Sequence, residues 1–134
     1  MTIADLRPGL RAFLLADAAV SAAVGGSRIY PVVLEQGQRG ASIVYNRVTG
    51  QGDHHMEGPS GLSRPRYQID AYAPFPDDAN TLADLVKDRL DGYRGLMGAV
   101  MVQGCFFETE RDDYQPDIDL HRVSRDYLIW FEEA

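Results

Sequence analysis

The chain has little of what several protein classes require. Cys105 is the only cysteine in 134 residues, so no intramolecular disulfide can form, and this usage suits a reducing cytosol. No apolar run approaches the roughly 20 residues of a membrane span. The net charge of −7 argues against a nucleic-acid-binding protein, which would cluster Lys and Arg against phosphates. The N-terminus also lacks a signal-peptide pattern, which predicts synthesis and use in the cytoplasm, at least initially.

What is present is the composition of an ordinary globular domain. Hydrophobic residues make up 45% of the chain and charged residues 25%, both close to the average for soluble proteins. A chain of this length buries about two thirds of its unfolded surface, so it needs no metal or disulfide for stability. We therefore predict a single domain over residues 1–134.

Apolar residues recurring at spacings of three and four predict two main helices and a short one. Regular turns of the first should begin near Arg7, because Pro8 is tolerated only in a first turn. Asp17 is the expected N-cap of the short helix, and Gly92 the expected end of the last. The predicted ranges are 2–16, 17–24 and 74–92.

Alternation of apolar and polar residues predicts five strands. The last is apolar on both faces, which is typical of a central strand or of one covered by a partner. Residues 111–119 are strongly polar and are predicted to form a loop. The fold class is therefore α+β, a mainly antiparallel sheet with a long β-hairpin, packed on one face by the two main helices. The strand ranges are 28–34, 41–49, 65–73, 100–110 and 122–132.

The segment 50–63 lies between two predicted strands and is dense in Gly, Pro, Ser and His. The two flanking strands predict one long antiparallel hairpin with an extended tip. Small domains seldom keep a protruding loop of this length without a function for it.

Four groups contain residue types that are found in catalytic or metal sites. Adjacent His54 and His55 lack the i, i+4 spacing of a helical zinc site and lie far from the one cysteine. Ser60 fails the G-x-S-x-G spacing, since Gly61 follows it directly, and it precedes a strand. Cys105 sits in an apolar strand, which favours a buried, inert thiol. The carboxylates between Glu108 and Asp119 lack a calcium-loop pattern. We predict no catalytic residue, no metal and no cofactor.

Several segments, taken together and in order, resemble the tail terminator (tail completion, head–tail joining) family of long-tailed bacteriophages and gene transfer agents. The resemblance covers nearly the whole chain. Its most specific parts are Gly58 to Tyr72 and the LDGYRG turn, Leu90 to Gly95. The other segments are LRAFLLADAAVSAAVGGSRIYPVVLEQG, ASIVYNRVTG, VQGCFFETERDDY and RVSRDYLIWFEE.

The resemblance implies a non-enzymatic structural protein of the virion. It would form a homo-hexameric ring that caps the tail tube, stops tube polymerisation and presents a surface to the head connector. DNA would pass through the lumen without sequence-specific binding, and no membrane partner is implied. The alternatives are another connector ring, such as a stopper, or a small α+β enzyme or ligand-binding domain.

An interface with neighbouring subunits or tail proteins is predicted at the loop and at the strand that follows it. Arginines there could pair with a neighbour's carboxylates, and the two-faced last strand could supply apolar surface. The predicted interface residues are His54, His55, Met56, Glu57, Pro59, Arg64, Arg66 and Trp130.

Overall fold

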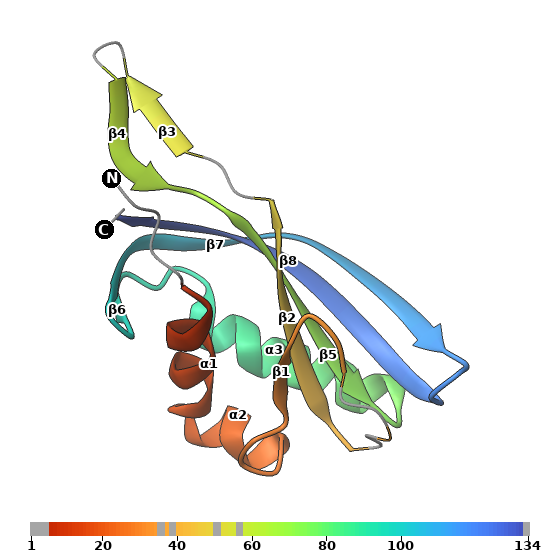
Figure 1. Cartoon of the computed structure of the whole chain (residues 1–134). Helices are drawn as coiled ribbons and strands as arrows, with labels where there is room; N and C mark the ends of the chain where they lie inside the picture. Colours follow the sequence, from red (N-terminus) through yellow and green to blue (C-terminus); the bar gives the residue numbers. More distant parts are fainter. Residues whose placement is uncertain (1–5, 35–36, 38–39, 50–51, 56–57, 133–134) are drawn as a thin grey trace.

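The computed structural model describes residues 6–34, 37, 40–49, 52–55 and 58–132 (Figure 1). Within these residues there are three helices and eight strands. The helices are α1 (Arg7–Leu15), α2 (Ala18–Ala23) and α3 (Pro76–Leu90). The strands are β1 (Ile29–Pro31), β2 (Ser42–Thr49), β3 (Gly52–His55), β4 (Gly58–Ser63), β5 (Arg66–Ala73), β6 (Gly95–Met97), β7 (Val100–Gln115) and β8 (Leu120–Glu132).

The strands form one sheet in which β8 is central. β8 pairs antiparallel with β5 along one side and with β7 along the other, and its last residues also pair with β4. β2 pairs antiparallel with β5, and β1 lies parallel to β2 at the end of this row. The predicted α+β class, with a mainly antiparallel sheet, is confirmed, and so is the central position of the last strand.

The helix boundaries follow the local chemistry of the sequence. α1 begins at Arg7, with Pro8 in its first turn, where a missing N–H costs nothing. The Asp17 side chain accepts a hydrogen bond of 3.0 Å from the backbone N–H of Ala19 and so caps α2. Gly92 adopts a φ of +80° directly after the C-cap of α3, a conformation that glycine reaches without strain. All three predicted boundary features are confirmed.

The helices pack on one face of the sheet and enclose the main core. Leu10 and Leu14 of α1 and Leu82 of α3 are buried against strand residues such as Tyr67 and Ile129. Burying large apolar side chains in this way contributes about 1.5–3 kcal/mol each. None of the described helices is long and apolar enough to cross a membrane.

One charged side chain joins the helix layer to the sheet. Arg125 of β8 is only 6% exposed, and its Nη1 atom lies 2.9 Å from an Asp84 carboxylate oxygen of α3. Its Nε atom donates to Glu110 of β7 at 2.8 Å. Two carboxylates therefore compensate the cost of burying this guanidinium.

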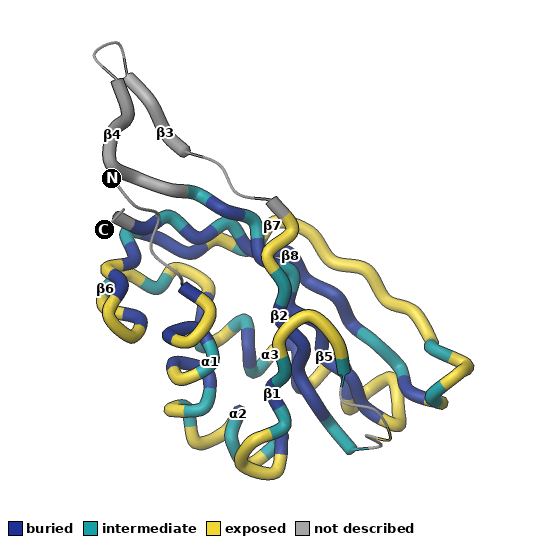
Figure 2. The backbone as a smooth tube through the Cα atoms, in the orientation of Figure 1, coloured by how far each residue is buried: buried dark blue, intermediate teal, exposed yellow. Residues whose placement is uncertain are grey.

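The predicted loop at 111–119 is largely wrong. β7 continues as a strand to Gln115, and the β7–β8 ribbon extends beyond the helices with the far half of β7 exposed (Figure 2). Opposite charges across the ribbon hold the polar part together, because Arg122 faces Asp113 and Arg125 faces Glu110. Cross-strand ion pairs of this kind stabilise a strand that apolar patterning cannot reveal. The short strand β6 was also not predicted.

Residues 52–63 form an antiparallel hairpin, β3–β4, which we call the arm. The predicted pairing of the flanking strands is confirmed, since Ile43 of β2 lies opposite Ala71 of β5. The arm does not simply lengthen that pair, because Leu62 and Ser63 of β4 lie opposite Glu132 and Phe131 of β8. In Figure 1 the arm projects away from the helices at one end of the sheet.

Candidate assembly interface

The tip of the arm brings three of the predicted interface residues together by backbone register. His54 lies opposite Pro59, and His55 lies opposite Gly58. Met56 and Glu57 fall outside the described residues, as do the side chains of the arm. The interface role of all five tip residues stays a prediction.

The root of the arm is fixed by an arginine on an aromatic ring. The guanidinium carbon of Arg64 lies 5.3 Å from the centre of the Trp130 ring, within the range of a cation–π contact. The backbone N–H of Ile129 donates to the carbonyl of Pro65 at 3.1 Å. The structure thus brings together two of the predicted interface residues, Arg64 and Trp130, and both are partly buried.

Arg66, the second arginine candidate, forms ion pairs within its own chain. Its Nη2 atom lies 3.6 Å from Glu108, and its Nη1 atom lies 3.7 Å from Asp126. The Arg66 side chain is 31% exposed, so such pairs contribute at most about 1 kcal/mol. A contact between Arg66 and a neighbouring subunit stays a prediction.

Arg66 belongs to a charged network on the sheet face that none of the described helices covers, which we call the open face. Arg111 lies 3.8 Å from Asp126 and donates to Gln68 and to the Ser124 hydroxyl, both at 3.2 Å. Ser124 and Asp126 are buried on this face, where the Arg111 guanidinium contacts both. Side-chain hydrogen bonds and ion pairs therefore contribute to the burial of residues on this face, as the helices do on the opposite face.

The second half of the network is centred on Arg122. This guanidinium donates to Asp113 through Nε at 2.9 Å, and its Nη1 atom lies 3.8 Å from Asp70. Burial raises the pKa of the Asp70 carboxyl above its ordinary value, against the hydrogen bonds and charges that favour ionisation. The hydrogen bond from Arg122 lowers the pKa of Asp113. The pKa values of the two carboxylates that share the Arg122 guanidinium are therefore shifted in opposite directions.

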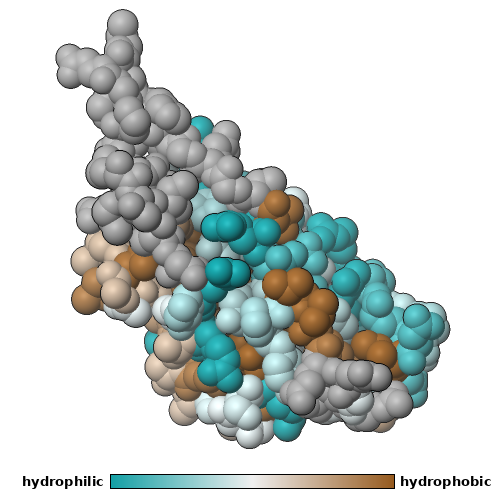
Figure 3. All heavy atoms as spheres, viewed as in Figure 1, coloured by the Kyte–Doolittle hydropathy of each residue, from teal (hydrophilic) through white to brown (hydrophobic). Residues whose placement is uncertain are grey.

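Apolar side chains lie at both ends of this network. Phe106 is 50% exposed near the arm, next to the partly buried Leu128 and Trp130. At the other end, Val44, Tyr72 and Leu120 form a small cluster separate from the main core. An apolar surface mixed with charged groups is typical of protein–protein interfaces. On the face seen in Figure 3, hydrophobic and hydrophilic side chains also alternate and form no single large apolar patch.

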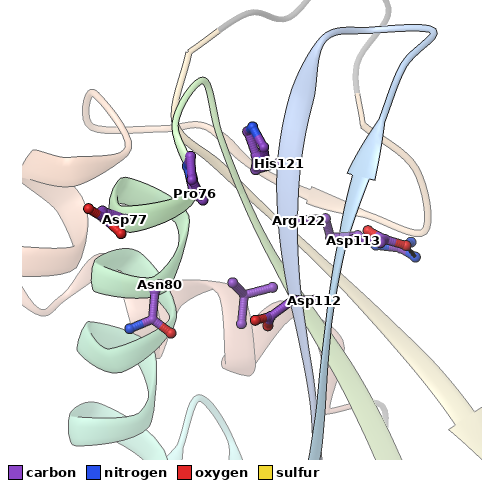
Figure 4. Close-up of a pocket in the computed structure, with 8 residues that line it drawn as sticks. Pro76, Asp77, Asn80, Asp112, Asp113, His121 and Arg122 are labelled. Carbon is purple, nitrogen blue, oxygen red and sulfur yellow. Dashed lines mark hydrogen bonds and ion pairs between the residues drawn. The ribbon is translucent and has the colours of Figure 1, made fainter.

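A cavity of about 230 Å³ lies between the start of α3 and the β7–β8 ribbon. Figure 4 shows Asp77 and Asn80 on the first turns of α3, with Asp112 and His121 contributed by the two strands. Among the described residues, no group of three His, Cys, Asp or Glu side chains is placed to hold a metal ion. The polar lining of the cavity combines three carboxylates with one amide, one imidazole and one guanidinium: Asp77, Asp112, Asp113, Asn80, His121 and Arg122.

Cys105, unlike the residues that line this cavity, is not accessible to solvent. It is fully buried, and burial raises the pKa of its thiol to about 12. A thiol that stays protonated at neutral pH is a poor nucleophile. The prediction of a buried cysteine is confirmed.

Sequence reasoning missed the network of the open face. The composition of the carboxylates between Glu108 and Asp119 predicts a solvated loop, and no local pattern connects them with the arginines of β8. A usable signal was present, because Asp113 and Arg122 lie at nearly equal distances from the turn at 116–119, as do Glu110 and Arg125. Opposite charges placed symmetrically about a turn indicate a hairpin.

Comparison with known protein families decides the affiliation of this fold. Residues 8–132 match the family described as tail completion protein gp17. The chain belongs to this family. The predicted resemblance is confirmed, and the protein is a structural component of a tail.

The tail completion fold is also found among solved structures. A chain titled "Virion of native gene transfer agent (GTA) particle" superposes with a TM-score of 0.79 at 19% sequence identity, covering 95% of this chain and 94% of that one. At this identity the likeness shows the shared fold. A search of curated protein sequences finds no match.

Proposed function

We propose that this protein is a tail terminator: a homo-hexameric ring that caps the tail tube, stops its polymerisation and joins the tail to the head connector. It acts without enzymatic activity, at the head–tail interface of a phage or gene transfer agent particle, after assembly in the cytoplasm of the bacterial host. The observation that carries the proposal is the family match over residues 8–132.

The open face supports this function by its chemistry. A ring subunit needs apolar surface to bury and charged groups that fix its orientation toward a neighbour. On the open face the apolar surface comes from Phe106, Leu128 and Trp130. The charged groups come from the network around Arg66 and Arg122. Arg64, Arg66 and Trp130 of the predicted interface lie at the root of the arm beside this surface, and we propose that the interface continues along the arm to the predicted residues His54, His55, Met56, Glu57 and Pro59.

The net charge is compatible with a DNA channel. A protein of charge −7 repels DNA phosphates over most of its surface. A lumen lined by such a surface lets DNA slide through rather than bind.

The deciding experiment compares particles assembled with and without this protein. Without it, we expect tail tubes of uncontrolled length that do not join heads. A density map of complete particles should show a six-fold ring of this chain in contact with the tube. A ring located on the portal side without tube contact would instead identify a stopper, and tubes of normal length in its absence would contradict the proposal.

Deleting Asp53 to Gly61 tests the arm directly. In the described backbone pairing the arm joins β8 through Leu62 and Ser63, which the deletion leaves in place, so the variant should keep its thermal unfolding midpoint. Joined particles should be lost, because the arm is proposed to contact a neighbour. Normal yields of joined, infectious particles would remove the arm from the interface.

A further inference from the structure

The two lateral edges of the sheet differ in how their backbone groups are satisfied. At the β1 edge, the carbonyl of Ile29 accepts a hydrogen bond of 3.0 Å from the Arg11 side chain, and Pro31 has no N–H to offer. This edge is closed by α1 and by proline, which are common protections of an edge strand.

The first part of the β7 edge is closed as well. β6 pairs with Val100 to Val102, and the turn after α3 covers the next residues. The N–H of Gly92 donates to the carbonyl of Cys105 at 2.7 Å, and the N–H of Phe107 donates to the Asp91 carboxylate at 3.0 Å. These bonds also show that Cys105 and Phe107 direct their backbone groups away from β8.

Beyond Phe107, the edge of β7 is open. A bulge makes Glu108 an extra residue, since Phe107 and Thr109 lie opposite consecutive residues of β8. Alternation of the hydrogen-bonding direction then turns the N–H and C=O groups of Glu110, Asp112 and Tyr114 outward. No strand of the described chain pairs with this stretch, and all three residues are exposed.

The open stretch has the length of a complete strand. Thr109 to Gln115 spans about 20 Å at the usual rise per residue, and average strands have about five to six residues. Unpaired edges of this length are templates for strand addition by another chain.

The charge of the edge determines what can pair with it. Residues 108–115 contain one cation, Arg111, and four carboxylates, which are Glu108, Glu110, Asp112 and Asp113. A second copy pairing through its own β7 would place carboxylates opposite carboxylates, which is destabilising. The β1 edge of a second copy is closed, and β3, at the far end of the sheet, contains no Lys or Arg.

We propose that the open edge of β7, from Thr109 to Gln115, binds an extended basic segment of a different tail protein by strand addition. Alternate Lys or Arg side chains of that segment face the carboxylates of the edge. Glu110 and Asp113 already bind Arg125 and Arg122, whereas Asp112 has no cationic partner in the described part of the chain. This contact does not depend on whether the protein forms a hexameric ring.

The cavity beside the edge gives this partner a place for one long side chain. Asp112 lines the cavity together with Asp77 and Asn80 of α3 (Figure 4). A Lys or Arg next to Asp112 on the added strand reaches both carboxylates. The start of α3 thereby contributes to the selection of a basic segment.

Photo-crosslinking in complete particles tests the proposal. Position 112 is replaced by p-benzoylphenylalanine, with exposed Asp88 of α3 replaced in the same way as the control. We expect crosslinks from position 112, and fewer from position 88, to a Lys- or Arg-containing stretch of another tail protein, identified by mass spectrometry. Crosslinks only to a second copy of this chain, or none from position 112, overturn the proposal.

Binding of designed peptides to the purified protein provides a second measurement. The probe is a peptide alternating Lys with Thr or Val, and its counterpart has Glu in place of Lys. The Lys peptide should shift the amide signals of Glu110, Asp112 and Tyr114 in nuclear magnetic resonance spectra, and salt should weaken it. Absence of binding, equal binding of the Glu peptide, or shifts at other residues contradict the proposal.

Two substitutions separate backbone pairing from charge. Asp112→Pro removes an outward N–H that β8 does not use, and it should abolish binding of the Lys peptide. Asp112→Asn keeps the backbone and should weaken binding about two- to fivefold, as expected for loss of one exposed ion pair. If Asp112→Pro does not fold, Asp112→Asn decides, and unchanged affinity in that variant overturns the proposed charge selection.

Discussion

The central strands carry buried side chains on both faces of the sheet, but different forces bury them. On the helix face, Tyr127, Ile129 and Phe131 are at most 1% exposed beneath apolar helix side chains. On the open face, Asp70 and Ser124 are at most 6% exposed, with no helix above them. The first face is closed by non-directional apolar packing, and the second by hydrogen bonds and ion pairs of fixed geometry.

This difference indicates a division of labour. Apolar burial stabilises the fold with little dependence on pH or moderate salt. A network of charges gives modest net stability because each group must lose water, but it fixes the positions of the groups that a neighbour meets. We therefore expect the helix face to determine stability and the open face to determine assembly.

The largest effect is expected on the helix face, from Ile129→Ala. Ile129 is fully buried, and the truncation leaves a cavity in the main core. Loss of packing there should lower the free energy of unfolding by about 2–5 kcal/mol in urea denaturation. A loss below about 1 kcal/mol would show that the core collapses onto the cavity, and would weaken the contrast between the faces.

A smaller loss is expected on the open face, from Arg122→Ala. The substitution leaves Asp70 buried without its cation and frees Asp113 to solvent. Removing a charged hydrogen-bond partner should cost about 1–3 kcal/mol in the same denaturation experiment. Arg122→Gln, which keeps part of the side-chain volume, is the matched variant. Stability equal to the original protein in both variants would show that the network contributes nothing to folding.

The pH dependence of stability should separate the two carboxylates bound to Arg122. The pKa of Asp70 is raised in the folded state, so its contribution is fully present below its ordinary pKa of 3.8 and is lost as the pH rises through the raised value. The pKa of Asp113 is lowered, so its contribution is present above 3.8 and is lost as the pH falls.

The free energy of unfolding of Asp70→Asn and of Asp113→Asn, measured over a pH series, gives the contribution of each carboxylate to stability. Relative to the original protein, Asp70→Asn should gain stability as the pH rises from about 4 to 7, because it removes a titrating group that opposes folding there. Asp113→Asn should instead lose relative stability as the pH rises from about 2 to 4, because the Asp113 contribution of the original protein develops over that interval. Parallel curves for the two variants would contradict the opposite pKa shifts.

The smallest effect on stability is expected from Phe106→Ser. Phe106 is half exposed, so the free energy of unfolding should change by no more than about 0.5 kcal/mol. Assembly into rings or joined particles should nevertheless fall, since the substitution removes apolar surface from the open face. Leu96→Ser, at a similarly exposed apolar residue of β6, is the control. An equal assembly defect in both variants would exclude a specific role of the open face.

The elements with apolar periodicity could be predicted from the sequence. Leu82, Val86 and Leu90 recur at helical spacing, and Tyr67, Ile69 and Ala71 alternate, so α3 and β5 follow from local patterns. The far half of β7 could not be predicted in this way. Its residues are polar on both faces, and they are held in a strand by pairing with charges that lie 9 and 15 residues further along the chain.

The candidate interface shows the same difference between what local patterns predict and what strand pairing determines. Segment 50–63 stands out by composition, and the sequence alone indicates Arg64, Arg66 and Trp130 as interface candidates. The partners of these residues depended on the register of β8 with β5 and β7, which placed Arg66 near Asp126 and Glu108. Asp70 and Arg122 were not named, because neither has a local pattern that marks it.

The sequence by itself determined the fold class, the helix ends, the arm and the family resemblance, because these depend on spacing, caps, turn residues and motif order within short segments. Only the tertiary structure decided that the open face is sealed by its own charges and that β7 keeps one free edge. Both features depend on which strands lie side by side, and that arrangement is set by packing between residues distant in the chain.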